Sequence, residues 1–394
     1  MSLRSLIVGG GIGGLAAGLA CSRAGAQVSL YERAGEFSEV GAGIQLGPNV
    51  VKVLHGWGLN DALAQVAAFP NRLQVRSAMS GAQLAVMRLG TMTVERYGSP
   101  YATIHRADLH AMLLAALTQQ SGVQLHLGSA AAGFVQQADG VTLHLSNGRA
   151  AQGDLLVGAD GLWSRLRQQL LNDSPPHSAG HLAYRALVPQ HGLPARLRSG
   201  QVTVWLGPRL HVVQYPVRRG EWLNVVVIVH GHTAGDVEQW DRNADAADVQ
   251  DAMAATCTPL QDLIHAIETW RLWALSIRAP MRGAHKQAQG RVALLGDAAH
   301  PMLPYLAQGA GMAIEDADEL GRVLAGAQDP LHDVPALLRQ YALRRWQRNA
   351  RVQARAIRNG QVFHATGLVR WSRDRAMKLL GERLLDLPWL YRGA

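Results

Sequence analysis

Three glycines near the start of the chain have the spacing of a phosphate-binding turn. Gly9, Gly11 and Gly14 form the pattern G-x-G-x-x-G directly after an apolar run at 6–8. The first glycine permits a tight bend, the second lets the backbone approach a pyrophosphate, and the third lets helix and strand pack closely. Free N–H groups at the start of the following helix favour bound phosphate. With Glu32 after the next apolar run, placed to hydrogen-bond a ribose, the motif predicts a dinucleotide site.

The same segment has the outline of a secretory signal peptide, because Arg4 precedes an apolar stretch that ends at Cys21. Glycines interrupt that stretch, however, and the strand that follows needs a partner from it. We therefore expect a buried strand and helix here rather than a leader.

The segment HVVQYPV (211–217) carries a second candidate for chemistry. On a strand, His211 and Tyr215 point to the same face, because alternate side chains share a face. Histidine titrates in the range useful for acid–base work, and a tyrosine hydroxyl can hydrogen-bond a phenolate. From the residues alone, a half-buried sheet face with a structural histidine explains this pattern equally well.

Two aspartates follow further apolar runs, Asp160 in GADG (158–161) and Asp297 in LLGDAAHP (294–301). Segment 308–311 then predicts the start of a helix, whose positive end would favour negative charge on a bound ring. Taken singly, each aspartate is ordinarily a helix cap or a turn former.

The elements that position these residues predict a mixed α/β fold. Strand–glycine–helix patterns at both ends of the chain indicate a discontinuous Rossmann-like domain, and the β-rich texture between them indicates a separate sheet domain. Segments 123–128 and 141–148 alternate apolar and polar residues, which predicts a short antiparallel insertion. The expected boundaries are 1–70, 100–180 and 281–330 for the dinucleotide domain, 71–99 and 181–280 for the sheet domain, and 331–394 for a C-terminal helical segment.

Composition restricts the class of protein. The 394 residues suggest two to three domains, and no uninterrupted apolar run is long enough to span a bilayer. Cys21 and Cys257 lack metal or redox spacing, so we expect no metal site and a reducing, cytoplasmic location. The net charge of +9 arises from 331–394, which contains 13 Lys and Arg against 4 Asp and Glu. These arginines are spread around a helix without a nucleic-acid motif, so we expect a solvated helix or subunit contact rather than nucleic acid or membrane as partner.

Taken together, the opening motif, GADG and LLGDAAHP in this order resemble the single-component FAD-dependent aromatic hydroxylases. IHRADLH (104–110), VGAGIQLGPN (40–49) and HVVQYPV are similar to the branch of salicylate hydroxylase, 3-hydroxybenzoate 6-hydroxylase and 6-hydroxynicotinate 3-monooxygenase. The resemblance implies a p-hydroxybenzoate-hydroxylase-like fold, non-covalent FAD, NADH or NADPH as transient reductant, and O2. A flavin C4a-hydroperoxide would hydroxylate a hydroxylated aromatic or heteroaromatic carboxylic acid, with or without loss of its carboxylate.

The resemblance also implies roles for individual residues. It assigns the FAD pyrophosphate to Gly9, Gly11 and Gly14, the adenosine ribose to Glu32, the phosphate–ribityl region to Arg106, and the ribityl or pyrophosphate part to Asp297. It associates Asp160 with FAD and the nicotinamide, and places Pro301, Gly309 and Gly311 along the flavin ring. His211 becomes the general base and Tyr215 a substrate-orienting group. Gln45, Asn49, Arg185 and Trp205 are weaker substrate candidates, for which packing or solvent exposure is an equal explanation.

Two other functions stay open at this point. One is an FAD-dependent reductase or dehydrogenase that does not use O2, although no second dinucleotide motif and no redox cysteine pair accompany the first motif. The other is a binding protein that uses its basic tail. The sequence allows a homodimer and leaves the oligomeric state open.

Overall fold

The computed structural model describes residues 2–37, 41–231, 242–327 and 333–393, which form two compact units. Each unit is built from three separate stretches of chain and is described by itself. Unit 1 comprises Met1–Val40, Ala107–His177 and Ile277–Ala356, and unit 2 comprises Gly41–Arg106, Ser178–Ser276 and Ile357–Ala394.

The unit boundaries differ from the domain boundaries expected from the sequence. Residues 41–70 and 100–106 belong to unit 2, because β3 (Gly43–Leu46) pairs with β6 (Ala102–His105) within that unit. The C-terminal helical segment is divided between the units, since α10 (Val334–Phe363) continues past Ala356.

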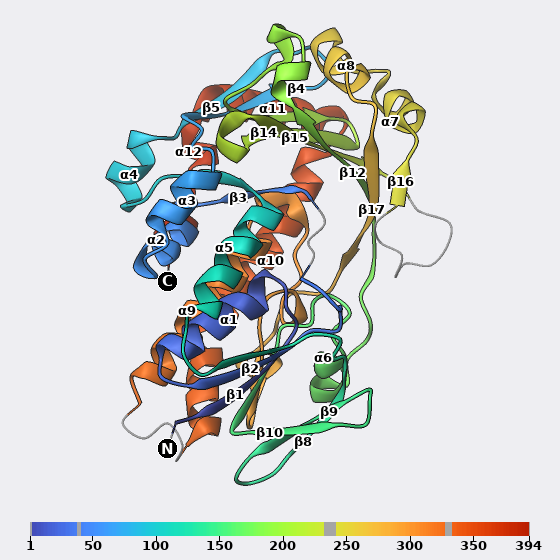
Figure 1. Ribbon diagram of the computed structural model, residues 1–394. Helices are drawn as coiled ribbons and strands as arrows, with labels where there is room; N and C mark the ends of the chain where they lie inside the picture. Colours follow the sequence, from blue (N-terminus) through green and yellow to red (C-terminus); the bar gives the residue numbers. More distant parts are fainter. Residues whose placement is uncertain (1, 38–40, 232–241, 328–332, 394) are drawn as a thin grey trace. The chain divides into compact units, whose positions relative to one another are not determined.

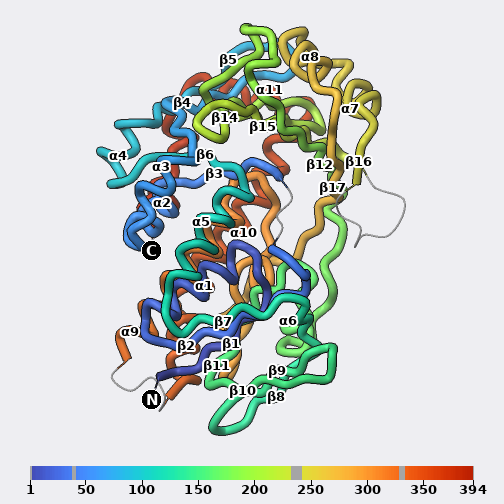
Figure 2. Tube along the Cα trace, in the orientation of Figure 1, coloured from blue at the N-terminus to red at the C-terminus, as the bar shows by residue number. Residues whose placement is uncertain are grey.

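Unit 1 is organised by a six-stranded sheet in the order β18-β19-β11-β1-β2-β7. All its pairs are parallel except β18–β19. The inner strands are short apolar runs because parallel strands are covered on both faces. The strands are β1 (Arg4–Val8), β2 (Gln27–Tyr31), β7 (Val123–His126), β11 (Leu155–Gly158), β18 (Ala288–Gln289) and β19 (Val292–Leu294). Figure 2 shows the traces of β1, β2, β7 and β11 close together in unit 1.

Two layers cover the faces of this sheet, as Figure 1 shows for unit 1. Helices α1 (Ile12–Arg23), α5 (Arg106–Thr118) and α9 (Gly309–Ala325) lie on one side of β1 and β2. An antiparallel sheet of β8 (Ala131–Gln136), β9 (Val141–Leu145) and β10 (Ala150–Gly153) lies on the other side, with α6 (Arg165–Leu171). Leu6, Val8 and Leu156 on the sheet share a core with Phe134 and Leu143 of this layer.

One expected strand pairing is wrong. Segment 123–128 does not join an antiparallel insertion with 141–148, because β7 pairs in parallel with β2 and extends the main sheet. The insertion instead consists of β8, β9 and β10. Alternation of side chains predicted the strands but not their partners, because partner choice is made by tertiary packing.

Unit 2 is organised by an eight-stranded sheet in the order β16-β17-β12-β15-β14-β13-β4-β5. The strands are β4 (Arg72–Ser77), β5 (Gln83–Arg88), β12 (His177–Pro189), β13 (Val202–Gly207), β14 (Leu210–Val217), β15 (Trp222–His230), β16 (Arg242–Ala244) and β17 (Trp270–Ile277). β14 lies inside this sheet, between β13 and β15, so the segment with His211 and Tyr215 is a strand as the alternation predicts.

Unit 2 also contains helices outside this sheet. They are α2 (Pro48–Gly56), α3 (Asn60–Val66), α4 (Thr91–Tyr97), α7 (Ala246–Met253), α8 (Thr258–His265), α11 (Gly367–Leu380), α12 (Glu382–Leu385) and α13 (Pro388–Tyr391). One sheet face, with Val212 and Val225, packs against Val249 of α7 and Leu260 of α8. The opposite face, with Leu206, packs near Met377 of α11. Within the described residues, no helix combines the length and apolar character that a membrane span requires.

Candidate functional site

The glycine turn of unit 1 leaves no room for side chains where a phosphate would approach. A Cβ on Gly14 would lie 1.8 Å from the carbonyl oxygen of Gly9, and one on Gly9, whose φ is +107°, would lie 2.3 Å from that of Ala159. Helix α1 begins at Ile12, and its N-cap residue Gly11 offers no side chain to its first N–H groups. The turn therefore presents backbone donors and a helix N-terminus to an anion, which fits a pyrophosphate.

Glu32 lies directly at this turn. Its carboxylate accepts hydrogen bonds from the backbone N–H groups of Gly10, at 2.6 Å, and Ala34, at 2.8 Å. On the other side of the turn, the His110 ring nitrogen Nε2 lies 2.7 Å from the carbonyl oxygen of Gly10. Sequence reasoning did not single out His110, although it lies in the IHRADLH motif four residues after Arg106. Arg106 itself is the half-buried first residue of α5.

Asp160 makes the contacts of a helix-capping residue. Its carboxylate accepts a hydrogen bond from the Ser164 hydroxyl at 2.6 Å and from the Leu166 N–H at 3.3 Å, at the start of α6. Burial raises the pKa of this carboxyl. These contacts are those of a helix cap, which was the alternative to a binding role for this aspartate. The association of Asp160 with FAD and nicotinamide stays a prediction.

Arg167, which sequence reasoning missed, links two of the motifs. Its guanidinium donates to the carbonyl oxygens of Ala298 and Ala299, at 3.0 and 2.5 Å, and forms an ion pair with Asp173. The segment after GADG is thereby tied to the segment that carries Asp297. Asp297 is exposed in a run of otherwise buried residues from 291 to 301. It therefore projects outward from a fixed loop, as a ligand contact requires.

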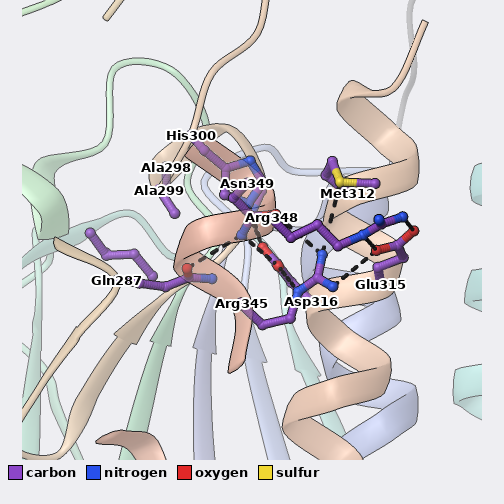
Figure 3. Close-up of polar contacts among 12 residues, drawn as sticks. Gln287, Ala298, Ala299, His300, Met312, Glu315, Asp316, Arg345, Arg348 and Asn349 are labelled. Atoms are coloured by element: carbon purple, nitrogen blue, oxygen red, sulfur yellow. Dashed lines mark hydrogen bonds and ion pairs between the residues drawn. The ribbon is translucent and has the colours of Figure 1, made fainter. Parts of the chain in front are cut away.

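A buried polar network holds this loop against two helices (Figure 3). His300 contacts Asp316 of α9 through Nε2, and the N–H of Gly296 lies 3.4 Å from the same carboxylate. From α10, Arg345 donates to Asp316 at 2.7 Å and to Glu315 at 2.9 Å. Asn349 adds a hydrogen bond to Asp316 at 2.9 Å. The network therefore positions the loop of Asp297 and Pro301 and the first turns of α9, which contain Gly309 and Gly311.

Electrostatics keep this network charged. Burial alone would raise the pKa of Asp316, but His300 and Arg345 outweigh it and hold that pKa well below its ordinary value. The Arg345 guanidinium is fully buried, and its two carboxylate partners raise its pKa despite that burial. Charged groups in a protein interior are tolerated when they are paired in this way.

The basic tail is not the solvated helix that its spread of arginines indicated. Arg345 is completely buried, and Arg348 and Arg344 form ion pairs with Glu315 and Glu319 of α9. The distribution of arginines around the helix did not reveal this arrangement, because their carboxylate partners lie about 30 residues away along the chain. Part of the positive charge of the tail is therefore neutralised inside unit 1.

In unit 2, His211 and Tyr215 share one face of β14, with Val213 between them. On β14, His211 and Tyr215 alternate with Val212 and Gln214, and in the strand register Tyr215 lies opposite Asn224 of β15. His211, Tyr215 and Asn224 lie on one face and are buried, whereas Val212 and Gln214, also buried, point to the other face. The hydrogen-bond register thus brings Asn224, which sequence reasoning missed, to the face of the two candidates.

Tyr215 sits in a tightly packed polar environment. A Cβ on Gly43 would lie 2.7 Å from both its ring and the Asn224 amide carbon, and the Gly43 N–H donates to Asn224 at 2.7 Å. Burial raises the pKa of Tyr215, while Arg185 and a hydrogen bond with Gln45 lower it in part. Gln45 also accepts from the Tyr101 hydroxyl at 2.6 Å. Tyr215 thus remains a neutral hydrogen-bond donor at physiological pH.

His211 lies further along the same face, 1% exposed. Its Nδ1 is 2.7 Å from Nε2 of His364, the residue after α10, and its ring packs edge-on against Phe363. Burial, and then the neighbouring His364 and His181, lower the pKa of His211 well below its usual range. His211 is therefore neutral at physiological pH.

The weaker candidates are not all brought together. Arg185 of β12 is on the same sheet face as Tyr215 by register, with its guanidinium 3.3 Å from the ring centre of Trp273. Trp205 lies opposite Val212 and donates to Gln214, so it belongs to the other face. Asn49 is buried in the first turn of α2. The structure therefore groups Gln45 and Arg185 with Tyr215, and separates Trp205 from it.

Comparison with known proteins supplies the observation that decides the family. A family described as FAD binding domain matches residues 2–356. The chain is 36% identical to a 3-hydroxybenzoate 6-hydroxylase of Polaromonas naphthalenivorans, covering 98% of this chain and 95% of the relative. The chain belongs to the FAD-dependent aromatic hydroxylases. It is also 36% identical to a 6-hydroxynicotinate 3-monooxygenase of Bordetella bronchiseptica, over 89% of each chain.

A solved structure supports the same assignment for the fold. A salicylate hydroxylase substrate complex superposes with a TM-score of 0.84 at 27% identity, covering 100% of this chain and 96% of the other. The resemblance and fold class expected from the sequence are thus confirmed. The enzyme is an FAD-dependent monooxygenase that uses NAD(P)H as reductant, and the comparisons favour this activity over a reductase that does not use O2.

The contacts of Glu32 lead to a prediction about FAD binding. We expect Glu32→Ala to weaken FAD binding by about tenfold to a hundredfold, because a charged hydrogen-bond acceptor at the turn is lost. Fluorescence titration of the apoprotein with FAD measures the change. Glu36→Ala is the matched control, since Glu36 is exposed four residues later. Equal affinity of the Glu32 and Glu36 variants would contradict the assignment.

Proposed function

We propose that the enzyme hydroxylates a hydroxylated aromatic or heteroaromatic carboxylic acid, with His211 as general base and Tyr215 as orienting group. The observation that carries this proposal is that a neutral histidine and a neutral tyrosine, both buried, lie on the same face of β14. The names of the relatives, which include a hydroxybenzoate and a hydroxynicotinate hydroxylase, support this class of substrate.

The chemistry of hydroxylation explains why a base is needed. An aromatic ring accepts an electrophilic oxygen more readily when its hydroxyl group has lost the proton. The lowered pKa of His211 means that its ring is present in the neutral, base form at physiological pH. The same burial makes the protonated ring unfavourable, so the proton must be passed on after it is accepted. Four residues of strand separate the Cα atoms of His211 and Tyr215 by about 13 Å. Because both side chains point to the same side of the sheet, a single-ring acid bound over that face would lie within reach of both.

The remaining groups of the face suit the other parts of such a substrate. We assign the substrate carboxylate to Arg185, whose positive charge already acts on Tyr215. Asn224 fixes the backbone of β3 by accepting from the Gly43 N–H, and Gln45 fixes the hydroxyl of Tyr215 by a hydrogen bond. Gln45 is itself held by the Tyr101 hydroxyl. Buried surroundings of this kind exclude water and strengthen each hydrogen bond.

FAD, when bound, supplies the redox chemistry by accepting hydride from NAD(P)H and activating O2. The chain's own contribution is binding. We assign the pyrophosphate to the turn of Gly9, Gly11 and Gly14, and the ribose to Glu32. Arg106, Asp160, Asp297, Pro301, Gly309 and Gly311 are the further FAD contacts that we propose. The fit of the uncapped turn and the outward position of Asp297 support these assignments.

The experiment that tests the proposal is a substrate screen. The purified protein with its flavin is mixed with 3-hydroxybenzoate, 6-hydroxynicotinate and salicylate, and the oxidation of NADH or NADPH is followed. We expect one class of acid to stimulate oxidation, with O2 and NAD(P)H consumed in equal amounts and a hydroxylated product formed. Release of CO2 identifies replacement of a carboxylate. Stimulation without O2 uptake would overturn the proposal in favour of a reductase.

We also propose that the enzyme works in the cytoplasm, where NAD(P)H is available. Cys21, which is buried, and Cys257 are both free thiols, as a reducing compartment allows. A homodimer stays a prediction.

The paired arginines lead to a prediction about partners. We expect no tight binding of duplex DNA or anionic vesicles at near-physiological salt, where binding by charge alone is weak. Arg344, Arg345 and Arg348 already neutralise carboxylates of α9. Anisotropy with labelled DNA and vesicle sedimentation measure binding. Saturable binding at that salt concentration would revive a binding role for the tail.

A further inference from the structure

Three histidines of unit 2 form a continuous hydrogen-bonded chain. Nδ1 of His211 is 2.7 Å from Nε2 of His364, and Nδ1 of His364 is 3.0 Å from Nε2 of His230. Both ring nitrogens of His364 are therefore engaged, one on each side. The three residues come from β14, the end of β15 and the turn after α10.

Exposure increases along this chain. His211 is 1% exposed and His364 is 5% exposed, whereas His230, at the end of β15, is exposed to solvent. The chain thus connects a deeply buried imidazole to water through a single intermediate ring.

One residue, Arg209, holds the backbones of His364 and His230 together. The N–H of Arg209 donates to the carbonyl oxygen of His364 at 3.1 Å, and the carbonyl oxygen of Arg209 accepts from the N–H of His230 at 3.2 Å. Arg373 donates to the carbonyl oxygens of Val362 and Phe363 at the end of α10. The spacing of the rings is therefore fixed by backbone contacts as well as by their own hydrogen bonds.

A buried base needs such a connection. After it accepts a proton, an imidazolium in a dry interior is unfavourable, and the proton must leave before the next turnover. We propose that His364 and His230 are a proton relay that carries the proton from His211 to solvent and back. This proposal rests on the proposed role of His211 as the base of the hydroxylase.

The transfer balances without a further reactant. The phenolic proton moves to Nε2 of His211 as the Nδ1 proton of His211 moves to Nε2 of His364. The Nδ1 proton of His364 moves to Nε2 of His230, and the Nδ1 proton of His230 leaves for water. One proton enters, one leaves, and each ring changes tautomer. Return of a proton to the product hydroxyl reverses the steps and restores the starting tautomers.

The groups packed around the three hydrogen-bonded histidines favour the neutral form of their rings. Burial lowers the pKa of His364 to about 3, with further contributions from His181, His230 and Arg373. Burial and Arg209 lower the pKa of His230. Because no ring retains the proton, charge is passed outward rather than stored.

A metal site is the competing explanation of this cluster. His181 packs against both His230 and His364, and one ring nitrogen from each of the three lies within 4.8 Å of the others. A metal ion held by the three histidines would need a ring nitrogen of His364, and both of these are engaged in hydrogen bonds with His211 and His230. Metal binding and the relay are therefore mutually exclusive, and metal analysis separates them.

The test follows exchange of ring protons with water in histidine-15N-labelled holoenzyme by NMR. We expect His230→Ala to slow exchange of the His364 and His211 ring protons by about tenfold or more, since exchange then requires local opening. Added imidazole, which enters the space left by His230, should restore it. His191→Ala is the control, because His191 is exposed on the same unit and is not one of the three hydrogen-bonded histidines. The readout needs no turnover, so it stands apart from the substrate screen.

A kinetic experiment uses the acid that the screen selects. Turnover of His230→Ala should fall by about tenfold to a hundredfold, less than the loss expected for the base itself, and should recover with imidazole. Unchanged proton exchange in His230→Ala, or slowed exchange that imidazole does not restore, would overturn the relay. Stoichiometric metal in the purified protein that is lost in His230→Ala would overturn it as well.

Discussion

Replacement of His211 by glutamine should lower turnover by about 10² to 10⁴, the range for a positioned general base. Glutamine preserves the size and polarity of the side chain but cannot take a proton at physiological pH. FAD binding should be unaffected, because His211 is in unit 2 and the glycine turn is in unit 1. Steady-state kinetics, with hydroxylated product counted against NAD(P)H oxidised, measure the change.

The pH profile identifies the cause of that loss. The wild-type base has a lowered pKa, so it stays neutral and active as the pH falls below 6.5. In His211→Gln the substrate must ionise without help, so the rate should rise about tenfold per pH unit until the pH reaches the phenol pKa, near 10. Recovery of activity at high pH also excludes misfolding. A variant with the wild-type rate and profile would return His211 to a packing role.

Two companion variants define the specificity of this result. His265→Gln removes an exposed histidine at the end of α8 and should leave the rate and the profile unchanged. Tyr215→Phe keeps the base but loses the hydroxyl that orients the ring. We expect it to divert NAD(P)H into hydrogen peroxide rather than product, which a peroxide assay detects.

Replacement of Arg345 by methionine should reduce the free energy of unfolding by about 3–5 kcal/mol, because it leaves buried carboxylates without their partner. Glu315 and Asp316, both buried, accept its two ion pairs. FAD occupancy should fall as well, since Asp316 also anchors His300 and Gly296 in the loop of Asp297. Urea denaturation and the flavin-to-protein absorbance ratio measure the two effects.

Matched variants test whether the network itself is responsible. Arg339→Met removes an exposed arginine from the same helix and should change stability by less than about 0.5 kcal/mol. Arg345→Lys keeps the charge but loses the two-pronged geometry, so its loss should be intermediate. Because the pKa of Asp316 is below its ordinary value of 3.8, its contribution is present above that pH and declines as the pH falls further. Equal stability of the Arg345 and Arg339 variants would contradict this account.

Local pattern determined much of the nucleotide-binding unit. The turn of Gly9, Gly11 and Gly14, the strand before it and the helix after it lie within about twenty residues, so spacing alone predicts them. Alternation likewise predicted β14 and the shared face of His211 and Tyr215. These features depend on the backbone periods of helix and strand, which each short segment carries by itself.

Only the tertiary structure decided which distant groups meet. His364 reaches His211 across 153 positions of sequence, and Arg345 reaches Asp316 across 29. No periodicity encodes such contacts, because they arise where separate elements cross, and a buried polar group takes whichever partner the packing presents. For the same reason β7 joined the parallel sheet rather than an antiparallel one. The family and the turn could therefore be predicted from the residues, whereas the environment of the base and the support of the loop required the folded chain.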